Sequence, residues 1–255
     1  MTRPQHGRNI RRVTLEGMRD VASFLASMPA EYRAAFDEQA QAEHAEIAGA
    51  RGERASLVAT WNGDRDGATA ICIVADDSPG LFSRISAALV AHDLDVVAAE
   101  AYCRRREGGA VEAVDLLWIR REAPLGARDI AAIGAMIDAL VRGVVRFEAP
   151  YRPPRRIGAA TRIRFEQEGG TTVLTVEAAD RPGLLLAMTK TIFLARMQIV
   201  GLHAKSERGR AVDRFQLAEL DGGAVAQHRL LELQSAILEA IDAAHSGVAL
   251  RASVP

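Results

Sequence analysis

Apolar residues recur along this chain with two spacings, and these spacings predict strands and helices in a definite order. Alternation over 55–61 and an apolar run over 68–75 flank a loop rich in turn-forming residues, a pattern typical of a β-hairpin. Further elements follow as a helix at 81–92, strands at 94–104 and 111–120, a helix at 127–141 and a short strand at 144–148. The predicted order is strand, helix, strand, strand, helix, strand.

The same order recurs from residue 159 to the end of the chain. A hairpin is predicted at 161–166 and 171–178, and the turn that follows each apolar strand is nearly identical in sequence. The shared positions, each displaced by 103 residues (180 − 77), are Asp77, Pro79, Gly80 and Leu81 in the first copy and Asp180, Pro182, Gly183 and Leu184 in the second. After the next turn the displacement falls to 98, from Asp115 to Asp213. A period near 100 residues indicates a duplicated domain rather than a solenoid.

Two helices are predicted ahead of the first copy. Residues 1–12 are basic and poor in apolar side chains, so we expect a flexible start. Residues 13–26 carry a helical stripe that Met28-Pro29 ends. From residue 30 a single amphipathic helix is expected, with Tyr32 and Phe36 on its apolar side, up to the glycines at 49–52. The Pro- and Arg-rich run 149–158 indicates an extended linker.

Composition is that of a globular protein. The chain has 255 residues, 49% of them hydrophobic and 25% charged, with a formal net charge of −1. A net charge so close to zero gives no reason to expect a nucleic-acid or membrane partner. Neither a long apolar run nor a signal-peptide pattern is present, so the sequence predicts a cytoplasmic protein.

Metal and cofactor chemistry is not expected from the spacing of the cysteines and histidines. Cys72 and Cys103 lie in apolar strand patterns, and no His-x-x-x-His or Cys-x-x-Cys spacing occurs. In a sheet of order 4-1-3-2 the two cysteines are separated by a strand and lie roughly 10 Å apart. That distance exceeds the reach of a disulfide, so both are predicted to be free thiols.

The repeated turn is the candidate binding element. Proline suits the first turn of a helix, and the adjacent glycine leaves the backbone bare. The free N–H groups and partial positive charge of a helix N-terminus favour the carboxylate of a small ligand. A strand-to-helix turn that binds nothing is the alternative, and the occurrence of two copies in register favours a site.

These residues resemble a known family. Each copy is similar to an ACT domain, a small regulatory βαββαβ module with an Asp-x-Pro-Gly-Leu turn and a following strand that begins Leu-x-Val or similar. The resemblance implies an α+β fold of two ferredoxin-like ACT domains in tandem. It implies an N-terminal helical extension at 1–54, ACT domain 1 at 55–150, a linker at 151–158 and ACT domain 2 at 159–255. In each domain, two helices are expected on one sheet face, with the open faces or edges protected by pairing of the two domains with each other or with a second chain.

The order of the flanking segments narrows the resemblance. Met28-Pro29-Ala30-Glu31-Tyr32, the Pro-Arg bridge and the strand from Ala211 to Phe215 are similar to the C-terminal region of bacterial protein-PII uridylyltransferase/uridylyl-removing enzymes. The catalytic motifs of that family, a Gly-Ser turn with paired aspartates and a His-Asp metal motif, do not occur in residues 1–54. The resemblance therefore implies a regulatory chain and no enzyme, with glutamine as the candidate ligand.

The ligand-binding candidates follow from the two turns and the strands behind them. Asp95 and Gln198 stand where many ACT domains have asparagine, and Asp95 is expected to face a ligand amino group beside the first turn. Asp115 and Asp213 are alternative acids, interpreted as surface or turn-adjacent residues. The candidates are Asp77, Ser78, Pro79, Gly80, Leu81, Asp95, Val96, Asp180, Arg181, Pro182, Gly183, Leu184 and Gln198.

Three functions are consistent with these patterns. The first is an amino-acid sensor that acts through a protein partner or a separate catalytic subunit, as a homo-oligomer. The second is an interaction module that pairs through its sheets or helices and binds no small molecule. The third is an enzyme, but we find no nucleophile–base pair, phosphate loop or metal cluster in the sequence. A uridylyltransferase label by similarity alone would also fit this chain.

Overall fold

The fold is α+β, with one large antiparallel sheet. The computed structural model describes residues 15–63, 65, 67–106, 108–148, 161–168, 170–244 and 251–253. Its helices are α1 (Leu15–Ser27), α2 (Ala30–Ala35), α3 (Glu38–Arg51), α4 (Leu81–Ala91), α5 (Ala127–Val141), α6 (Leu184–Leu194) and α7 (Gln227–Ala244). Its strands are β1 (Ser56–Thr60), β2 (Thr69–Asp76), β3 (Asp95–Arg105), β4 (Val111–Arg120), β5 (Arg146–Glu148), β6 (Arg162–Glu168), β7 (Thr171–Ala179), β8 (Met197–Glu207), β9 (Arg210–Glu219) and β10 (Arg251–Ser253).

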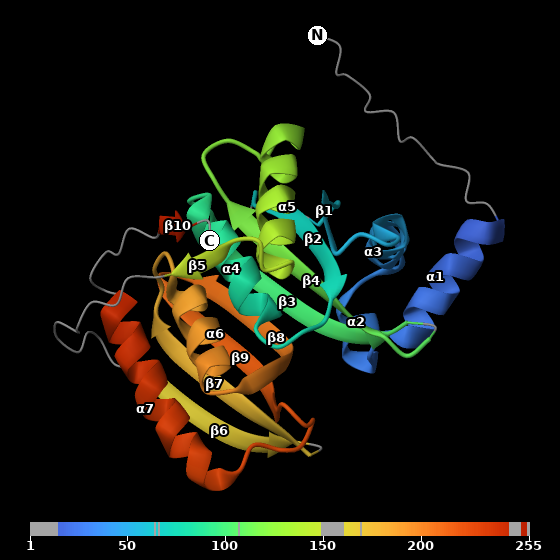
Figure 1. Ribbon diagram of the computed structural model, residues 1–255. Helices are drawn as coiled ribbons and strands as arrows, with labels where there is room; N and C mark the ends of the chain where they lie inside the picture. Colours follow the sequence, from blue (N-terminus) through green and yellow to red (C-terminus); the bar gives the residue numbers. More distant parts are fainter. Residues whose placement is uncertain are drawn as a thin grey trace.

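Eight of these strands form one continuous sheet in the order β1-β2-β4-β3-β8-β9-β7-β6 (Figure 1). The two copies meet at β3 and β8, which pair antiparallel from Ala98 opposite Lys205 to Ala101 opposite Leu202. Each of these strands would otherwise end its own half of the sheet with unpaired backbone groups. The expectation that the copies protect their edges by pairing with each other is confirmed.

The predicted closing strands are placed differently. The order 4-1-3-2 is wrong, because the hairpin strands β1 and β6, not the final strands, lie beside β2 and β7. β5 and β10 instead pair with each other in a separate two-stranded sheet. A short hairpin loop costs little closure entropy, so β1 and β6 occupy the positions that the closing strands would need.

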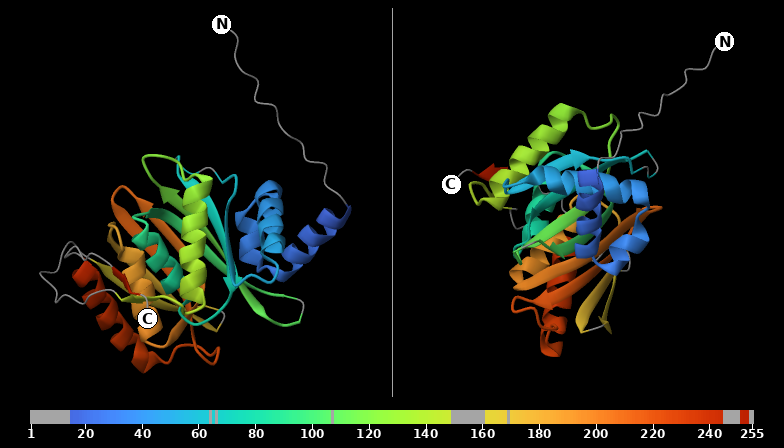
Figure 2. Two further views of the ribbon diagram at one scale, coloured as in Figure 1. Left: turned by 45° about the horizontal axis from the view of Figure 1, so that its top comes forward. Right: turned by 90° about the vertical axis from the view of Figure 1, so that its right-hand side faces the viewer.

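Four helices cover one face of the sheet, as predicted. α4 and α6 lie side by side at the centre, with α5 and α7 beyond them (Figures 1 and 2). Their apolar stripes pack on the strands in a shared core that includes fully buried Ile71, Ile85, Met188 and Phe215. Because both copies contribute to this core, it is continuous across the junction of the two copies.

Among the described residues, helices cover the second sheet face of the first copy and not that of the second. Helices α1–α3 lie over β2, β3 and β4, and Phe24, Tyr32 and Ala48 pack there against Cys72 and Trp118. The single helix predicted from residue 30 is wrong: α2 ends at Ala35 and α3 begins at Glu38. Asp37 separates them because its carboxylate accepts a hydrogen bond from the N–H of Ala40 (2.9 Å), as an N-cap residue does.

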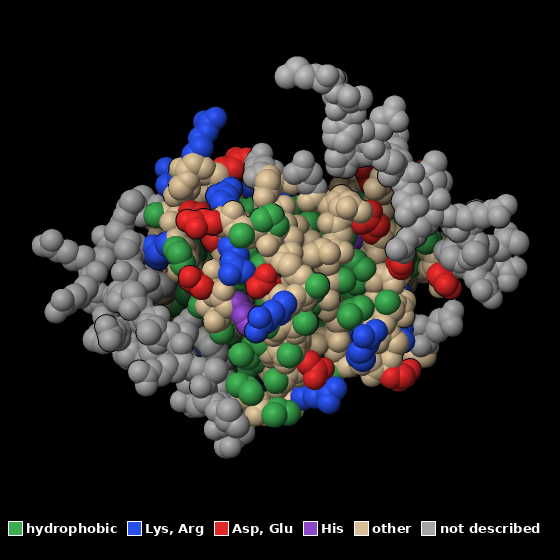
Figure 3. All heavy atoms as spheres, turned by 90° about the horizontal axis from the view of Figure 1, so that it is seen from above, with side chains coloured by type: hydrophobic (Ala, Val, Ile, Leu, Met, Phe, Trp, Pro, Cys, Tyr) green, Lys and Arg blue, Asp and Glu red, His purple; other side chains and the backbone are tan. Residues whose placement is uncertain are grey.

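Several other expectations are settled by the described residues. Cys72 and Cys103 are free thiols, as predicted, and β4 lies between their strands. Within the described ranges, no helix is long and apolar enough to span a membrane. Acidic and basic side chains are interspersed over the face seen in Figure 3. The predicted linker at 149–158 and the basic start at 1–12 lie outside the described residues.

Candidate functional site

Each repeated turn has the geometry of a β-turn that leads into a helix. In the first copy the N–H of Leu81 donates to the carbonyl of Ser78 (2.9 Å), and Gly80 has φ 77° and ψ 10°. These angles match the third residue of a type II turn, a position that favours glycine and that often follows a proline. Pro79 therefore precedes the helix, which begins at Leu81, and the expectation that it occupies the first helical turn is wrong.

The second turn has the same geometry. The N–H of Leu184 donates to the carbonyl of Arg181 (3.2 Å), and Gly183 has φ 80° and ψ −1°. Positive φ strains residues with a Cβ, so glycine is required at both positions for backbone reasons alone. Helix geometry also leaves the first N–H groups of α4 and α6 without intrahelical acceptors. Both turns thus have hydrogen-bond donors suited to an anionic group.

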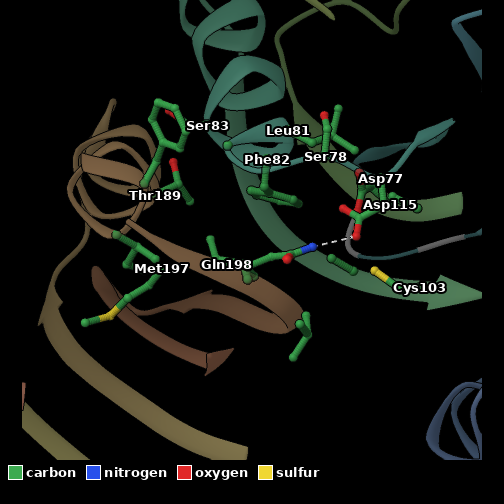
Figure 4. A pocket seen from close by; sticks show the side chains of 17 residues that line it. Asp77, Ser78, Leu81, Phe82, Ser83, Cys103, Asp115, Thr189, Met197 and Gln198 are labelled. Carbon is green, nitrogen blue, oxygen red and sulfur yellow. Dashed lines mark hydrogen bonds between the residues drawn. The ribbon is translucent and has the colours of Figure 1, made fainter. Parts of the chain in front are cut away.

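Each turn faces the strand of the other copy. The first turn lies against the start of β8, where the side chain of Gln198 donates from Nε2 to Oδ2 of Asp77 (2.7 Å; Figure 4). The second turn lies against the start of β3, where Asp95 and Val96 line the same hollow as Asp180 and Gly183. We call these the first junction and the second junction. The expectation that Asp95 lies beside the first turn is therefore wrong.

This exchange results from the pairing of β3 with β8. The two strands run antiparallel, so the start of β3 lies toward the end of β8 and the start of β8 toward the end of β3. Each strand start is thereby brought to the turn of the opposite copy. A ligand held at either junction would contact both copies.

The first junction is largely filled by side chains of the protein. The ring of Phe193, on α6, lies over Gly80, so closely that a Cβ built on Gly80 would be 2.6 Å from Cδ2 of the ring. Arg84 donates to Oγ of Ser78 (2.6 Å) and to the carbonyl of Pro79 (3.2 Å). The remaining free volume is about 30 Å³, enough for roughly one water molecule.

Asp77 and Asp115 bring two carboxyl groups into this junction (Figure 4). Burial raises the pKa of Asp77, although hydrogen bonds from Cys103 and Gln198 oppose the rise. Burial, and then the charge of Asp77, raise the pKa of Asp115 well above its usual range. Both causes favour the protonated form of Asp115.

The second junction is less occupied. No atom lies within 4 Å of a Cβ built on Gly183, in contrast to Gly80. Burial, followed by the charge of Asp180, raises the pKa of Asp95. The same two causes raise the pKa of Asp213 to about 7, against a hydrogen bond from the backbone of Lys205. The free volume here is about 40 Å³.

The burial of Asp115 and Asp213 was not expected from the sequence. Their exposed fractions are 2% and 4%, so their interpretation as surface residues is wrong. Both point to the helix-covered face, Asp115 between Ile73 and Ala101 of the neighbouring strands. The sequence did contain a sign of this burial. Ala113 and Leu117 are apolar and lie two residues to either side of Asp115, so all three side chains point to the same face of β4.

The structure gathers most of the predicted site residues into two groups. Asp77, Ser78, Gly80, Leu81 and Gln198 line the first junction, whereas Asp95, Val96 and 180–184 line the second. Pro79 shapes its turn without lining the hollow. The sequence did not indicate Ser86, Thr189 or Phe193, which reach the junctions from helix faces. Among the described residues, no group of three or more His, Cys, Asp or Glu side chains is arranged to hold a metal ion.

Comparison with known proteins finds relatives that cover most of this chain. No family model and no solved structure matches the chain. Bifunctional uridylyltransferase/uridylyl-removing enzymes of Phenylobacterium zucineum and Caulobacter vibrioides are 28% and 29% identical over 86% of this chain. That of Novosphingobium aromaticivorans is 31% identical over 76% of it. The chain covers only 24%, 24% and 22% of these relatives, so it resembles about a quarter of each enzyme.

Proposed function

We propose that this chain is a regulatory module whose two ACT domains, at 55–150 and 159–255, bind an amino acid where they meet. The observation that carries the proposal is the exchange of partners at the junctions, since each glycine turn faces a strand start of the other copy. A ligand carboxylate would bind the N–H groups at the start of α4 or α6, and its amino group an acid or amide of the opposite copy.

Ligand binding would act by a shift in population. A ligand that contacts both copies favours arrangements in which both sets of contacts are made, and only such differential affinity can move an equilibrium. The free volumes of about 30 and 40 Å³ are too small for a whole amino acid. Binding would therefore separate the turns from the facing strands, and a partner that contacts the helices or the sheet would sense this change.

Similarity to uridylyltransferase/uridylyl-removing enzymes supports a regulatory role in nitrogen metabolism, with glutamine as the first ligand to test. We propose that the chain itself is not catalytic and acts through a protein partner, such as a separate catalytic subunit, in the cytoplasm and as a homo-oligomer. The helices before residue 55 are an extension of the first domain. No cofactor enters this proposal.

A second candidate function is that of a pairing module that binds no small molecule. The first junction favours it, because Phe193 and Gln198 already occupy the space and the hydrogen-bonding groups that a ligand would use. In this case the two turns would only join the halves of the sheet.

Isothermal titration of the full chain with the twenty L-amino acids distinguishes the two functions. Saturable heat with a dissociation constant of about 1 mM or tighter for any amino acid supports the sensor, whereas no heat from any of them supports the pairing module. Glu177→Gln is a suitable control, because Glu177 lies on the outer sheet face with Arg164, away from both junctions. It should leave any affinity unchanged.

A further inference from the structure

Several polar groups of the first junction already have partners within the protein. The carboxylate of Asp77 accepts hydrogen bonds from Gln198 and from the thiol of Cys103. Oγ of Ser78 accepts one from Arg84, and Thr189 donates to the carbonyl of Leu186 (3.3 Å). A ligand at this junction would have to displace bonds already made, so it would gain little.

The second junction has a buried polar group without such a partner. Ser86, on α4, is 2% exposed and lines the hollow. Its Oγ has no hydrogen-bond partner in the described part of the chain. An unpaired buried hydroxyl is unfavourable, so each one in a native structure needs an explanation. A ligand with a donor or acceptor group here would satisfy it.

Acidic side chains outnumber basic ones in the lining of the second junction. Asp95 comes from the first copy, and Asp180 and Asp213 from the second. Two basic residues also line the hollow, and each has a partner: Nζ of Lys205 lies 2.5 Å from Oε1 of Glu207, and the guanidinium of Arg181 donates to the carbonyl of Ile241. Arg120 acts on Asp95 from outside the hollow. Like charges close together repel, so a cation placed between these carboxyl groups is favoured.

Most of the other residues that line the hollow are apolar, although Ser206 also lines it. Leu89, Val90 and Leu94 line it from the first copy, and Leu184 and Leu185 from the second. Apolar walls cannot replace the hydrogen bonds that water makes to an amide, so a polar ligand side chain would lose free energy there. An aliphatic group would gain it by leaving water.

We propose that the second junction, and not the first, is the ligand site, and that it recognises the protonated amine of an amino acid with an aliphatic side chain. This inference rests on the proposed function and changes its first candidate ligand from glutamine to an aliphatic amino acid. The amine binds between Asp95, Asp213 and Oγ of Ser86, and the carboxylate binds the N–H groups behind Gly183. A free volume of about 40 Å³ fits an ammonium group, and the aliphatic body enters as α4 and α6 separate.

The test uses three matched probes with the full chain: L-leucine, 2-hydroxy-4-methylpentanoate, which has a hydroxyl in place of the amine, and 3-methylbutylamine, which lacks the carboxylate. Isothermal titration measures affinity and thermal denaturation measures stabilisation. Replacing the amine by a hydroxyl, or Asp95 by Asn, should weaken binding roughly ten- to a hundredfold, because a charged hydrogen bond is lost. Ser86→Ala should weaken it by less, and Gln198→Ala, the matched control in the first junction, by no more than about twofold.

The outcomes separate this inference from the proposed function. If an amino acid binds and Gln198→Ala weakens it while Asp95→Asn does not, the second-junction site is wrong and the sensor function stands. If no amino acid binds but 3-methylbutylamine stabilises wild type and not Asp95→Asn, the amine site stands and the sensor function is wrong. Tighter binding of L-glutamine than of L-leucine overturns the aliphatic preference, and no response to any probe overturns both. If Asp95→Asn does not fold, Asp213→Asn takes its place.

Discussion

The two copies share their order of elements but differ on the sheet face away from α4–α7. In the first copy this face carries Ala70, Cys72, Val74, Leu116 and Trp118, all buried beneath α1–α3. In the second copy the matching strands have Thr175 and Glu177 on β7, and Val212, Arg214 and Gln216 on β9. Glu177 pairs there with Arg164 (2.6 Å), and Val212 is 45% exposed.

The difference shows that the same order of strands and helices can form with its second sheet face either buried or exposed. Strands that are apolar at both phases must be covered on both faces, whereas strands that alternate can leave one face in water. β4 is buried at eight of its ten positions, whereas β9 alternates buried residues with exposed or half-buried ones over 210–217. Within the part of the chain that the structure describes, the helices over the second face of the first copy thus follow from its side chains and not from the order of its elements.

The largest expected effect is at the attachment of α3 to the first copy. Arg51 is 3% exposed; its Nε lies 3.2 Å from Oε1 of Glu112, which is 1% exposed, and it also binds Asp76 (2.6 Å). Arg51→Ala leaves Glu112 with fewer partners in the interior and should cost about 3–5 kcal/mol of the free energy of unfolding, measured in urea. Arg164→Ala, which breaks an exposed pair in the second copy, is the control and should cost less than about 1 kcal/mol. Equal losses in both variants would show that the buried pair stabilises the protein no more than the exposed pair does.

Asp213 should make the second copy sensitive to pH. Burial raises its pKa from 3.8 to about 7, with the charge of Asp180 adding to the rise and the N–H of Lys205 opposing it. A raised carboxyl pKa favours the folded state at low pH, and this contribution is lost as pH rises from about 4 to about 7. Wild type should therefore lose roughly 4 kcal/mol of its free energy of unfolding over that range, relative to Asp213→Asn, which has no carboxyl group to titrate. Urea unfolding at pH 4.5, 6 and 8 measures it, and a constant difference would show that Asp213 titrates normally.

The two turn glycines should differ in their tolerance of a Cβ. Both have positive φ, so Gly80→Ala and Gly183→Ala should each cost about 1–3 kcal/mol from backbone strain. Gly80→Ala should cost more, because its Cβ also meets the ring of Phe193. Thermal denaturation of both variants, alone and combined with Phe193→Ala, tests this. The excess should disappear in the Phe193→Ala background, and an excess that remains would have another cause.

The smallest effect is expected on the open face of the second copy. Glu177 lies within 4 Å of basic groups on Arg162, Arg164 and Arg210, all of which are at least 49% exposed. Exposed ion pairs contribute little in water, so Glu177→Gln should change the free energy of unfolding by less than about 1 kcal/mol, and by less still in 0.5 M salt. A loss as large as that of Arg51→Ala would indicate that this face is buried in an assembly.

Much of the local structure was predictable from sequence. The 111–120 strand and the 127–141 helix were predicted with the bounds that β4 and α5 have, because both carry strong periodicity over many residues. The break between α2 and α3 was missed, since the apolar stripe from Tyr32 to Ile47 continues through Asp37, whose capping role depends on a single hydrogen bond.

The sequence by itself determined the duplicated turns, the glycines that positive φ requires and the free cysteines, because these depend on neighbours along the chain and on strand order near each residue. Only the tertiary structure decided which turn meets which strand. That choice follows from the pairing of β3 with β8, whose residues are about a hundred positions apart, and no periodicity specifies a partner at such a distance. The ring of Phe193 over Gly80 and the place of the unpaired Ser86 hydroxyl beside the second turn depend on that pairing, so these differences between the two junctions arise only in the folded molecule.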